Sequence, residues 1–163
     1  VESSGFMSPS PRKPRKPKVL PTLGWREWLS LPELGIQRIR AKVDTGARTS
    51  ALYATHVRVI DRNGMEYARF RLHYGLKGNR EFQMAEAQLM EFRTVRSSSG
   101  ESEERPVIRT RICVGGRCWR TEITLTSRRM MEFPMLLGRN SIARRFLVNP
   151  GASYCNAPET PVS

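Results

Sequence analysis

The chain has 163 residues, of which 39% are hydrophobic and 26% charged, proportions that suit one globular domain with a real core. Its 28 basic and 15 acidic residues give a formal net charge of +13, which attracts polyanions such as nucleic acid, anionic lipid or an acidic polypeptide. Simple solubility is the alternative explanation of this charge. No window approaches the run of about 18 apolar residues that a membrane-spanning helix needs, so such a span is excluded.

The first 22 residues differ in composition from the rest of the chain. They hold five basic residues against Glu2 and five of the chain's eleven prolines. Such a segment cannot bury enough apolar area to offset its chain entropy, so residues 1–22 are predicted to form a disordered or extended basic tail. Residues 23–154 are predicted to form the folded domain and residues 155–163 a short C-terminal tail, and together they keep +9 of the +13 charge.

Four segments in the first half of the domain alternate apolar and polar side chains with a period near two, which is typical of half-buried strands. They are residues 23–35, 36–43, 51–64 and 65–75. The third segment ends at Arg62-Asn63-Gly64, which favours a tight hairpin turn because Asn and Gly tolerate positive φ. This half of the domain is therefore predicted to consist of strands joined by turns.

The second half continues this pattern less uniformly. Residues 81–92 are ambiguous between helix and strand on composition alone. Residues 92–116 predict two strand-like arms around a small polar tip, and residues 117–127 alternate again as a strand. Together with the first half, this pattern indicates an all-β barrel or sandwich.

Near the C-terminus, the segment "FPMLLGRN" at residues 133–140 predicts a buried apolar strand that ends in glycine. A short helix is expected to follow it, with Asn140 or Ser141 as the N-cap. The segment "LVNPGASY" then returns to extended chain.

The three cysteines are Cys113, Cys118 and Cys155, an odd number without the density of a disulfide-rich secreted domain. Reduced thiols in a cytoplasmic protein are therefore the default expectation. A bridge between Cys113 and Cys118 across the Gly115-Gly116 turn is the alternative.

The segment "KVDTGARTSALYA", residues 42–54, places one carboxylate, Asp44, directly after an apolar strand. Taken alone, Asp-Thr-Gly is equally typical of a turn in which Asp accepts a hydrogen bond from its own backbone. The downstream segment "MLLGRN" makes the pair more specific. Together with "GWREWLSLPELG" and "RPVI", the two motifs resemble the retropepsins, the half-size aspartic proteases, over about residues 23–154. The match is greatest to a bacterial group labelled ATP-dependent zinc proteases, which is associated with ATP-grasp glutamate ligases.

The resemblance implies a retropepsin-like closed barrel with a flap hairpin and one short C-terminal helix. It also implies an aspartic endopeptidase that acts as a homodimer, because the chain holds a single Asp-Thr-Gly. Asp44 of each subunit would be the catalytic carboxylate. Water would be activated between the two carboxylates, which share one proton because like charges about 3 Å apart cannot both ionise cheaply. The supporting residues would be Thr45, Gly46 and Ala47 in the catalytic loop and Leu136, Leu137, Gly138, Arg139 and Asn140 in the strand and helix below it.

The resemblance further assigns the 92–116 hairpin as a flap that closes over a peptide substrate. The predicted substrate-binding residues are Arg48, Ser98, Ser99, Gly100 and Val107. Arg48 stands where viral retropepsins commonly carry an acidic residue that pairs with the arginine of Gly-Arg-Asn. Arg139 therefore needs another partner, either Glu33 or a backbone carbonyl, and Arg48 together with the basic domain favours acidic, glutamate-rich peptides.

Neither a metal nor a cofactor is expected. The chain lacks His-Glu-x-x-His and a phosphate-binding Gly-x4-Gly-Lys-Ser/Thr loop, and its only histidines are His56 and His73. Two other functions stay open. One is a catalytically silent peptide-binding module of the same fold, and the other is a basic protein associated with RNA or ribosomes, although nucleic acid is the less favoured partner.

Overall fold

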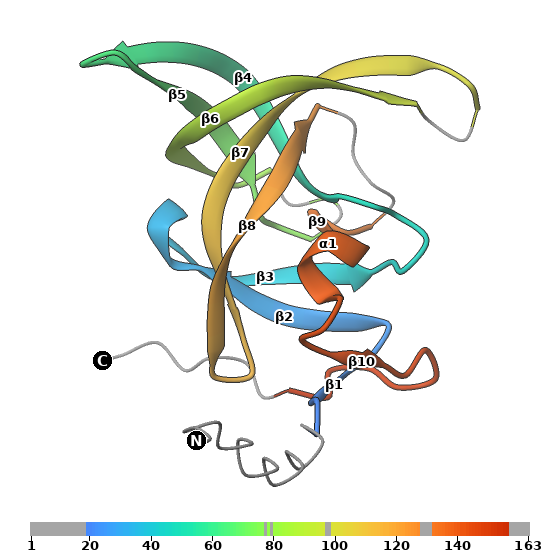
Figure 1. Cartoon of the computed structure of the whole chain (residues 1–163). Helices are drawn as coiled ribbons and strands as arrows, with labels where there is room; N and C mark the ends of the chain where they lie inside the picture. The colour runs from blue at the N-terminus through green and yellow to red at the C-terminus, as the bar shows by residue number, and fades with distance from the viewer. Residues whose placement is uncertain (1–18, 77, 79, 97–98, 128–131, 157–163) are drawn as a thin grey trace, which may run out of the picture.

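The computed structural model describes residues 19–76, 78, 80–96, 99–127 and 132–156, and most of them lie in one strongly curled sheet (Figure 1). Eight strands follow one another in the order β2-β3-β9-β4-β5-β6-β7-β8, and two additional pairings, β2 with β7 and β4 with β8, draw the sheet closed. The all-β prediction is confirmed. A separate pair, β1 with β10, joins the two ends of the described chain.

The elements have the following bounds, in chain order. They are β1 (Thr22–Leu23), β2 (Arg26–Leu31), the 3-10 turn η1 (Pro32–Leu34), β3 (Ile36–Val43), β4 (Ser50–Arg62), β5 (Met65–His73), β6 (Phe82–Arg96), β7 (Ser102–Val114), β8 (Arg117–Thr126), β9 (Met135–Leu137), α1 (Arg139–Ile142) and β10 (Leu147–Val148). The predicted strand over residues 36–43 coincides with β3. The predicted turn at Asn63-Gly64 joins β4 to β5 with both φ angles positive, 55° and 84°.

The core lies inside the curled sheet and is built from the alternate, inward-facing side chains of nearly every strand. Its largest fully buried members are Leu23, Leu29, Leu31, Ile39, Leu52, Phe70, Leu72, Ile108, Ile112, Ile123, Leu125 and Met135. The ambiguous segment 81–92 belongs to β6, because Ala85, Ala87 and Leu89 alternate inward while Glu86 and Gln88 lie outside. Pairing with β5 and β7 makes this segment a strand, a choice that its composition alone could not determine.

The two ends of the described chain meet around a buried carboxylate, Glu27 on β2. Its side chain is fully buried and accepts backbone N–H bonds from Gly24 at 2.6 Å, Cys155 at 2.8 Å and Asn156 at 3.2 Å. Residues 1–18 of the predicted basic tail lie outside the described residues, whereas Thr22 belongs to β1. The proposed domain limits stay a prediction.

The expectation of reduced thiols is wrong for two of the three cysteines. Cys113 and Cys118 stand directly opposite each other on β7 and β8, and the structure joins them as a disulfide; Cys155 is a free thiol. Gly115 and Gly116 make the intervening turn possible, with φ angles of 59° and 79°. The cytoplasmic assignment rested on reduced thiols and loses that support. As for membranes, the described part of the chain holds no helix with the length and apolar character that crossing one requires.

Candidate active site

The Asp44 loop, residues 44–49, is positioned by a three-strand arrangement in which β9 lies between β3 and β4. β3 enters the loop and pairs with β9 in parallel, so that Val43 stands opposite Leu137. β4 leaves the loop and pairs with β9 in the antiparallel sense, with Ala51 opposite Leu136. The "MLL" strand predicted to lie beneath the Asp-Thr-Gly loop therefore separates the two strands that carry it.

Backbone hydrogen bonds hold Asp44 at the end of β3. Its N–H donates to the Leu137 carbonyl at 2.9 Å, and its own carbonyl accepts the Ala47 N–H at 3.2 Å. Its carboxylate Oδ1 accepts the Gly46 N–H at 2.9 Å. Asp44 and Ala47 are half-buried, whereas Thr45 and Gly46 are exposed, so this loop presents its tip to solvent. The hydrogen bonds therefore fix the Asp44 carboxylate in place, while the loop around it remains accessible to solvent.

Gly46 is needed because the backbone here lies close to the Asp44 carboxylate, and not because of an unusual backbone conformation. A Cβ at this position would lie 3.1 Å from Asp44 Oδ1, and its φ is not positive. Any side chain here would press on the oxygen that accepts the Gly46 N–H. The small residue therefore protects the carboxylate geometry.

Gly138 marks the place where the strand after Phe133 touches the Asp44 loop backbone to backbone. A Cβ at Gly138 would lie 2.6 Å from the Thr49 carbonyl carbon and 2.9 Å from the Ser50 nitrogen. The Gly138 N–H donates to Ser50 Oγ at 2.9 Å. The contact leaves no room for a larger residue without moving the backbone.

Replacing Gly138 with alanine is expected to lower the free energy of unfolding by about 1–3 kcal/mol, the usual cost of overpacking a fitted interior. The strain falls on the Asp44 loop, so peptide hydrolysis should decline as well. Denaturant unfolding measures the first effect and initial rates the second. Gly151→Ala serves as a control for loss of a turn glycine, because its added Cβ would meet only Asn149 Oδ1 at 3.4 Å, an ordinary contact, and its φ is not positive. Equal rates in the two variants would contradict the expectation.

Arg139 clamps the loop from below. Its Nη1 donates to the Thr45 carbonyl at 3.1 Å and to the Gly46 carbonyl at 3.3 Å, while its N–H donates to the Ala47 carbonyl at 2.8 Å. Of the two partners considered for Arg139, the backbone carbonyls are therefore the ones observed. Glu33 instead accepts both ends of the Arg120 guanidinium on the opposite part of the sheet.

A chain of buried hydroxyls, which the sequence did not reveal, ties the loop to α1 and β8. Ser141 Oγ lies 2.8 Å from Ser50 Oγ and 2.9 Å from Thr121 Oγ1, and all three residues are buried. Thr124 Oγ1 donates to the Ser50 carbonyl at 3.1 Å. Single serines and threonines have no sequence signature for such contacts, because the partners lie up to 91 residues apart.

The predicted N-cap of the helix was wrong. α1 is capped by Gly138 without a side-chain hydrogen bond. Ser141 is occupied by the hydroxyl chain, and Asn140 Nδ2 donates to the Glu122 carbonyl at 3.3 Å. Both side chains that the local pattern predicted as caps therefore hydrogen-bond to residues distant in the sequence instead.

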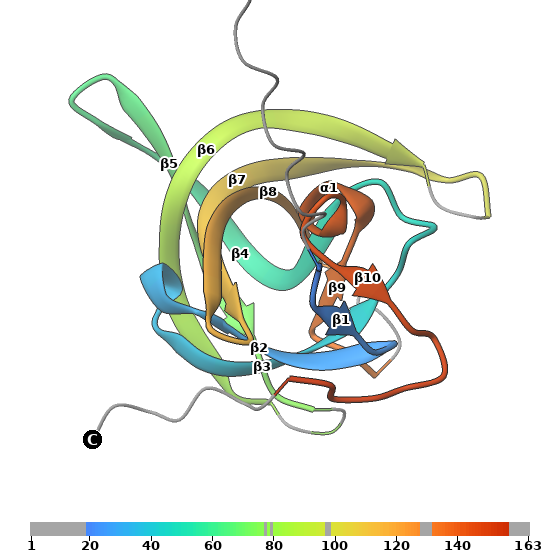
Figure 2. The same cartoon turned by 60° about the horizontal axis from the view of Figure 1, so that its bottom comes forward.

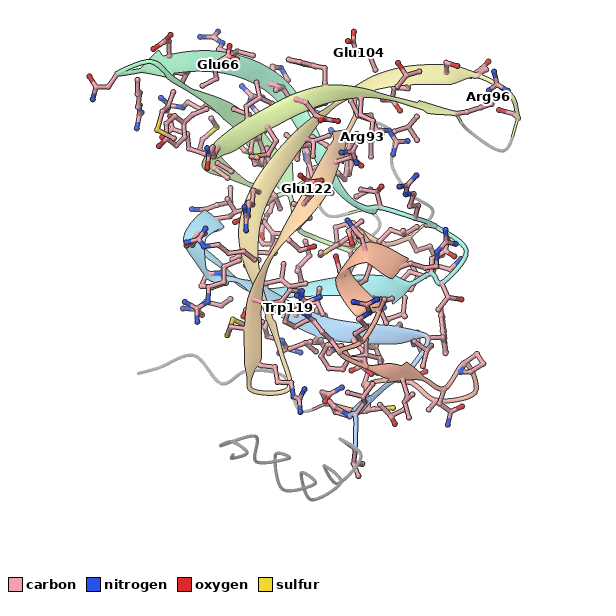
Figure 3. All side chains as sticks on the ribbon, in the orientation of Figure 1. Glu66, Arg93, Arg96, Glu104, Trp119 and Glu122 are labelled. Carbon is pink, nitrogen blue, oxygen red and sulfur yellow. A yellow bond between two sulfur atoms is a disulfide. The ribbon has the colours of Figure 1, made fainter. Side chains whose placement is uncertain are left out.

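The hairpin of β6 and β7 extends toward the side of the barrel where the Asp44 loop and α1 lie, as both views of the ribbon show (Figures 1 and 2). Its outer half is tied to the barrel by Arg93, which donates to Glu91 at 2.9 Å and to Glu122 of β8 at 3.3 Å (Figure 3). Hydrogen bonding to Glu91 raises the pKa of the Arg93 guanidinium above its ordinary value, so this tie stays charged. Glu103 of β7 accepts from Arg105 and Thr126 in the same region.

The residues predicted to bind substrate fall into different environments. Arg48 is exposed four residues after Asp44, and its guanidinium has no partner in the described part of the chain. Gly100 lies near the hairpin tip with a φ of 88° and open space around it, and Ser99 precedes it; Ser98 lies outside the described residues. Val107 is fully buried opposite Thr124, and this burial argues against its direct contact with a substrate.

The two histidines meet at Thr55 rather than at the Asp44 loop. His73 Nε2 lies 2.7 Å from Thr55 Oγ1, and His56 Nδ1 lies 3.0 Å from the same oxygen. Within the described ranges, no three or more His, Cys, Asp or Glu side chains gather as a metal-binding group. The expectation that the protein uses no metal stays a prediction.

A closed all-β sheet, an Asp-Thr-Gly loop and a glycine-ended strand threaded between its two flanking strands define the retropepsin-like class of folds. The chain belongs to the RimB-like family, described as retropepsin-like aspartic endopeptidase RimB, which matches residues 22–159.

Curated relatives match most of the chain, and a solved structure shares its fold. The chain is 40% identical over 133 residues to a probable alpha-L-glutamate ligase of Shewanella pealeana, which is 82% of this chain and 29% of the relative. It is 38% identical over 128 residues to a protein of the same name in Desulfotalea psychrophila, which is 78% of this chain and 28% of the relative. The chain thus spans under a third of these relatives' length. A crystal structure of a Legionella pneumophila protein of unknown function shares the fold, with a TM-score of 0.69 at 24% identity over 82% of this chain and 96% of that one.

Proposed function

We propose that this chain is an aspartic endopeptidase that works as a homodimer, with Asp44 of each subunit at the shared site. The observation that carries the proposal is the fixed, half-exposed Asp44 carboxylate at the end of β3, held by Leu137 and Gly46. Two such carboxylates would hold one water and share one proton. One would act as the base that deprotonates the water, and the other as the acid for the peptide carbonyl oxygen.

The second carboxylate has to come from outside this chain's own Asp44 loop. The only other aspartate is Asp61, and it accepts the Gly64 N–H at 3.0 Å in the turn at the far end of β4. A second copy supplies an identical carboxylate through a two-fold axis, which is the commonest symmetry of protein dimers. Thr45 supports this proposal, because its exposed hydroxyl makes no hydrogen bond within the described residues and is free to meet its counterpart.

The substrate is proposed to be an acidic, glutamate-rich peptide. Arg48 directly follows the loop tip, and the hairpin that would cover the site adds the exposed Arg96, whereas Arg93 and Arg105 are already paired with glutamates. The names of the curated relatives, which refer to glutamate ligation, agree with a substrate that carries added glutamate. An arginine-lined site attracts such chains over distances of about a Debye length.

Arg48→Gln is expected to lower kcat/KM on a glutamate-rich peptide by about fivefold, the effect of one partly screened charge pair. The same variant should cleave an uncharged peptide of equal length almost as well as the parent does. The preference should shrink as salt is raised from 50 to 300 mM. Arg144→Gln, which removes an exposed charge elsewhere, is the matched control. A preference for basic peptides would contradict the substrate proposal while leaving the aspartic mechanism standing.

A further inference from the structure

The outward side of the sheet carries a continuous basic surface away from the Asp44 loop. Residues directly opposite each other on neighbouring strands share a face of a sheet, as do residues two apart on one strand. The register places Arg58 opposite Arg69, Arg71 opposite Met84, Tyr67 opposite Gln88, Gln88 opposite Arg109, and Arg111 opposite Arg120. We call this surface the arginine face; it comprises Arg58, Tyr67, Arg69, Arg71, Phe82, Met84, Glu86, Gln88, Arg109, Arg111, Arg120 and Glu122.

The core lies on the other side of these strands. Ala68, Phe70 and Leu72 alternate with the arginines of β5, and Ile108 and Ile112 with those of β7, and all five are buried. Figures 1 and 2 place β5 and the first half of β6 across the barrel from the 44–49 loop. The arginine face is therefore a separate surface from the proposed catalytic site.

Several charges on the arginine face are unbalanced. Arg58 stands opposite Arg69 and Arg111 opposite Arg120, and like charges directly opposite each other on neighbouring strands destabilise a sheet. Glu33 neutralises Arg120, and Glu86 is engaged by Arg62. In the described part of the chain, Arg58 and Arg111 have no such partner, whereas Arg69 stands directly opposite Glu86 and Arg109 directly opposite Glu122. A bound polyanion would screen this repulsion. Folding alone does not require arginines to stand opposite each other.

The choice of cation points to an oxyanion as the partner. After residue 22 the sequence holds 21 arginines and only two lysines. Lysine would serve solubility equally well, whereas the guanidinium fork fits two oxygens of a phosphate or a carboxylate at once and also stacks on flat rings. Between Tyr67, Gln88, Arg109 and Arg120 the surface is hollowed by a cavity of about 220 Å³, whose wall also includes Glu33 and Glu86.

Aromatic rings lie among these arginines. Phe82 is 44% exposed, the Arg71 guanidinium lies 4.8 Å from its ring centre, and the His73 ring lies 6.0 Å away. Arg62 lies 5.9 Å from the Tyr67 ring. Exposed rings beside cations are the arrangement on which unpaired bases stack, whereas an acidic polypeptide needs the charges alone. Bases within a duplex are stacked on each other and do not offer their faces to a protein ring, so the exposed ring favours a single strand.

We propose that the arginine face binds single-stranded nucleic acid without sequence preference, with the guanidinium groups on the phosphates and Phe82 and Tyr67 beneath unstacked bases. The proposal does not depend on the peptidase activity, because the two surfaces are distinct. It also locates the binding on the folded barrel rather than on the basic N-terminal segment, which is the same in every variant of the test.

The test measures fluorescence anisotropy of a labelled oligouridine with the full chain, across salt from 50 to 200 mM. Arg69→Gln combined with Arg109→Gln should reduce the slope of log Kobs against log salt by about 1.4, since each phosphate contact in a single strand contributes about 0.7. The charge-matched pair Arg117→Gln with Arg144→Gln, both exposed and off the arginine face, should leave the slope unchanged. Phe82→Leu should weaken binding about tenfold at an unchanged slope.

Three results would overturn the proposal. Equal slope changes in the two arginine pairs would show that net charge alone is responsible. An unaltered affinity in Phe82→Leu would remove the stacking contact. Competition by oligoglutamate of equal charge as effective as that by unlabelled oligouridine would assign the face to acidic polypeptides instead. Melting curves of each variant ensure that the comparison is made between folded proteins.

Discussion

Asp44→Asn is expected to reduce peptide hydrolysis by at least about 1,000-fold while the barrel stays folded. An asparagine Oδ1 can still accept the Gly46 N–H, so the hydrogen bonds of the loop survive. The amide cannot share a proton with a second carboxylate, so both the acid and the base are lost, each typically worth 10²–10⁴ in rate. Initial rates on a glutamate-rich peptide measure the loss, and thermal melting shows whether the fold is retained.

The matched control is Asp61→Asn, the same substitution at the chain's other aspartate. Asp61 caps the turn between β4 and β5 through the Gly64 N–H, a role that the amide oxygen can also fill. Its rate should equal that of the parent. If Asp44→Asn kept its activity, the silent binding module would become the better account of this fold.

Mixing the parent with Asp44→Asn tests whether two subunits share one catalytic site or each subunit works alone. When parent and Asp44→Asn subunits exchange at equal amounts, only about a quarter of two-fold dimers hold two intact aspartates. At a constant total protein concentration, the activity of the mixture should therefore be about one quarter of the parent's activity. A fall to one half would mean that each chain works alone and that no second Asp44 is needed.

The sequence was informative where the signal is local. Period-two alternation located β3 to the residue, and Asn63-Gly64 located the turn after β4, because both depend on side chains within a few positions of each other. The Asp-Thr-Gly and Leu-Leu-Gly segments identified the loop and the strand beneath it through a resemblance. The helix or strand ambiguity at residues 81–92 could not be resolved, since pairing with β5 and β7 determines it.

What the sequence could not show are contacts between distant segments. Glu33 and backbone carbonyls were equally reasonable partners for Arg139, and only the fold places Thr45 and Gly46 within its reach. The Ser50–Ser141 contact joins residues 91 apart. Val107 was assigned to substrate on its place in the hairpin, but pairing with β8 buries it completely. Such errors arise because burial is a property of the closed sheet rather than of a short segment.

Glu27→Ala is expected to lower the free energy of unfolding by about 3–5 kcal/mol. The substitution removes a fully buried acceptor from three backbone N–H groups, those of the buried Gly24, the half-buried Asn156 and the exposed Cys155. An unsatisfied buried donor costs about 1–3 kcal/mol. Glu33→Ala is the control, because that carboxylate pairs with Arg120 at the surface, where such a pair contributes about 0–1 kcal/mol. Denaturant unfolding compares the two, and equal losses would mean that the three contacts of Glu27 contribute little.

The same substitution should loosen the strand that carries Asp44. Gly24 is held by Glu27, and the next residue, Trp25, accepts the Val43 N–H at 2.8 Å through its carbonyl while its own N–H donates to Ala152 at 2.8 Å. Val43 directly precedes Asp44, so opening of the clasp around Glu27 frees the end of β3. Hydrogen exchange at the Val43 amide should accelerate in Glu27→Ala well below the melting temperature, but not in Glu33→Ala. Unchanged protection at Val43 would show that the clasp stabilises the chain ends without reaching the Asp44 loop.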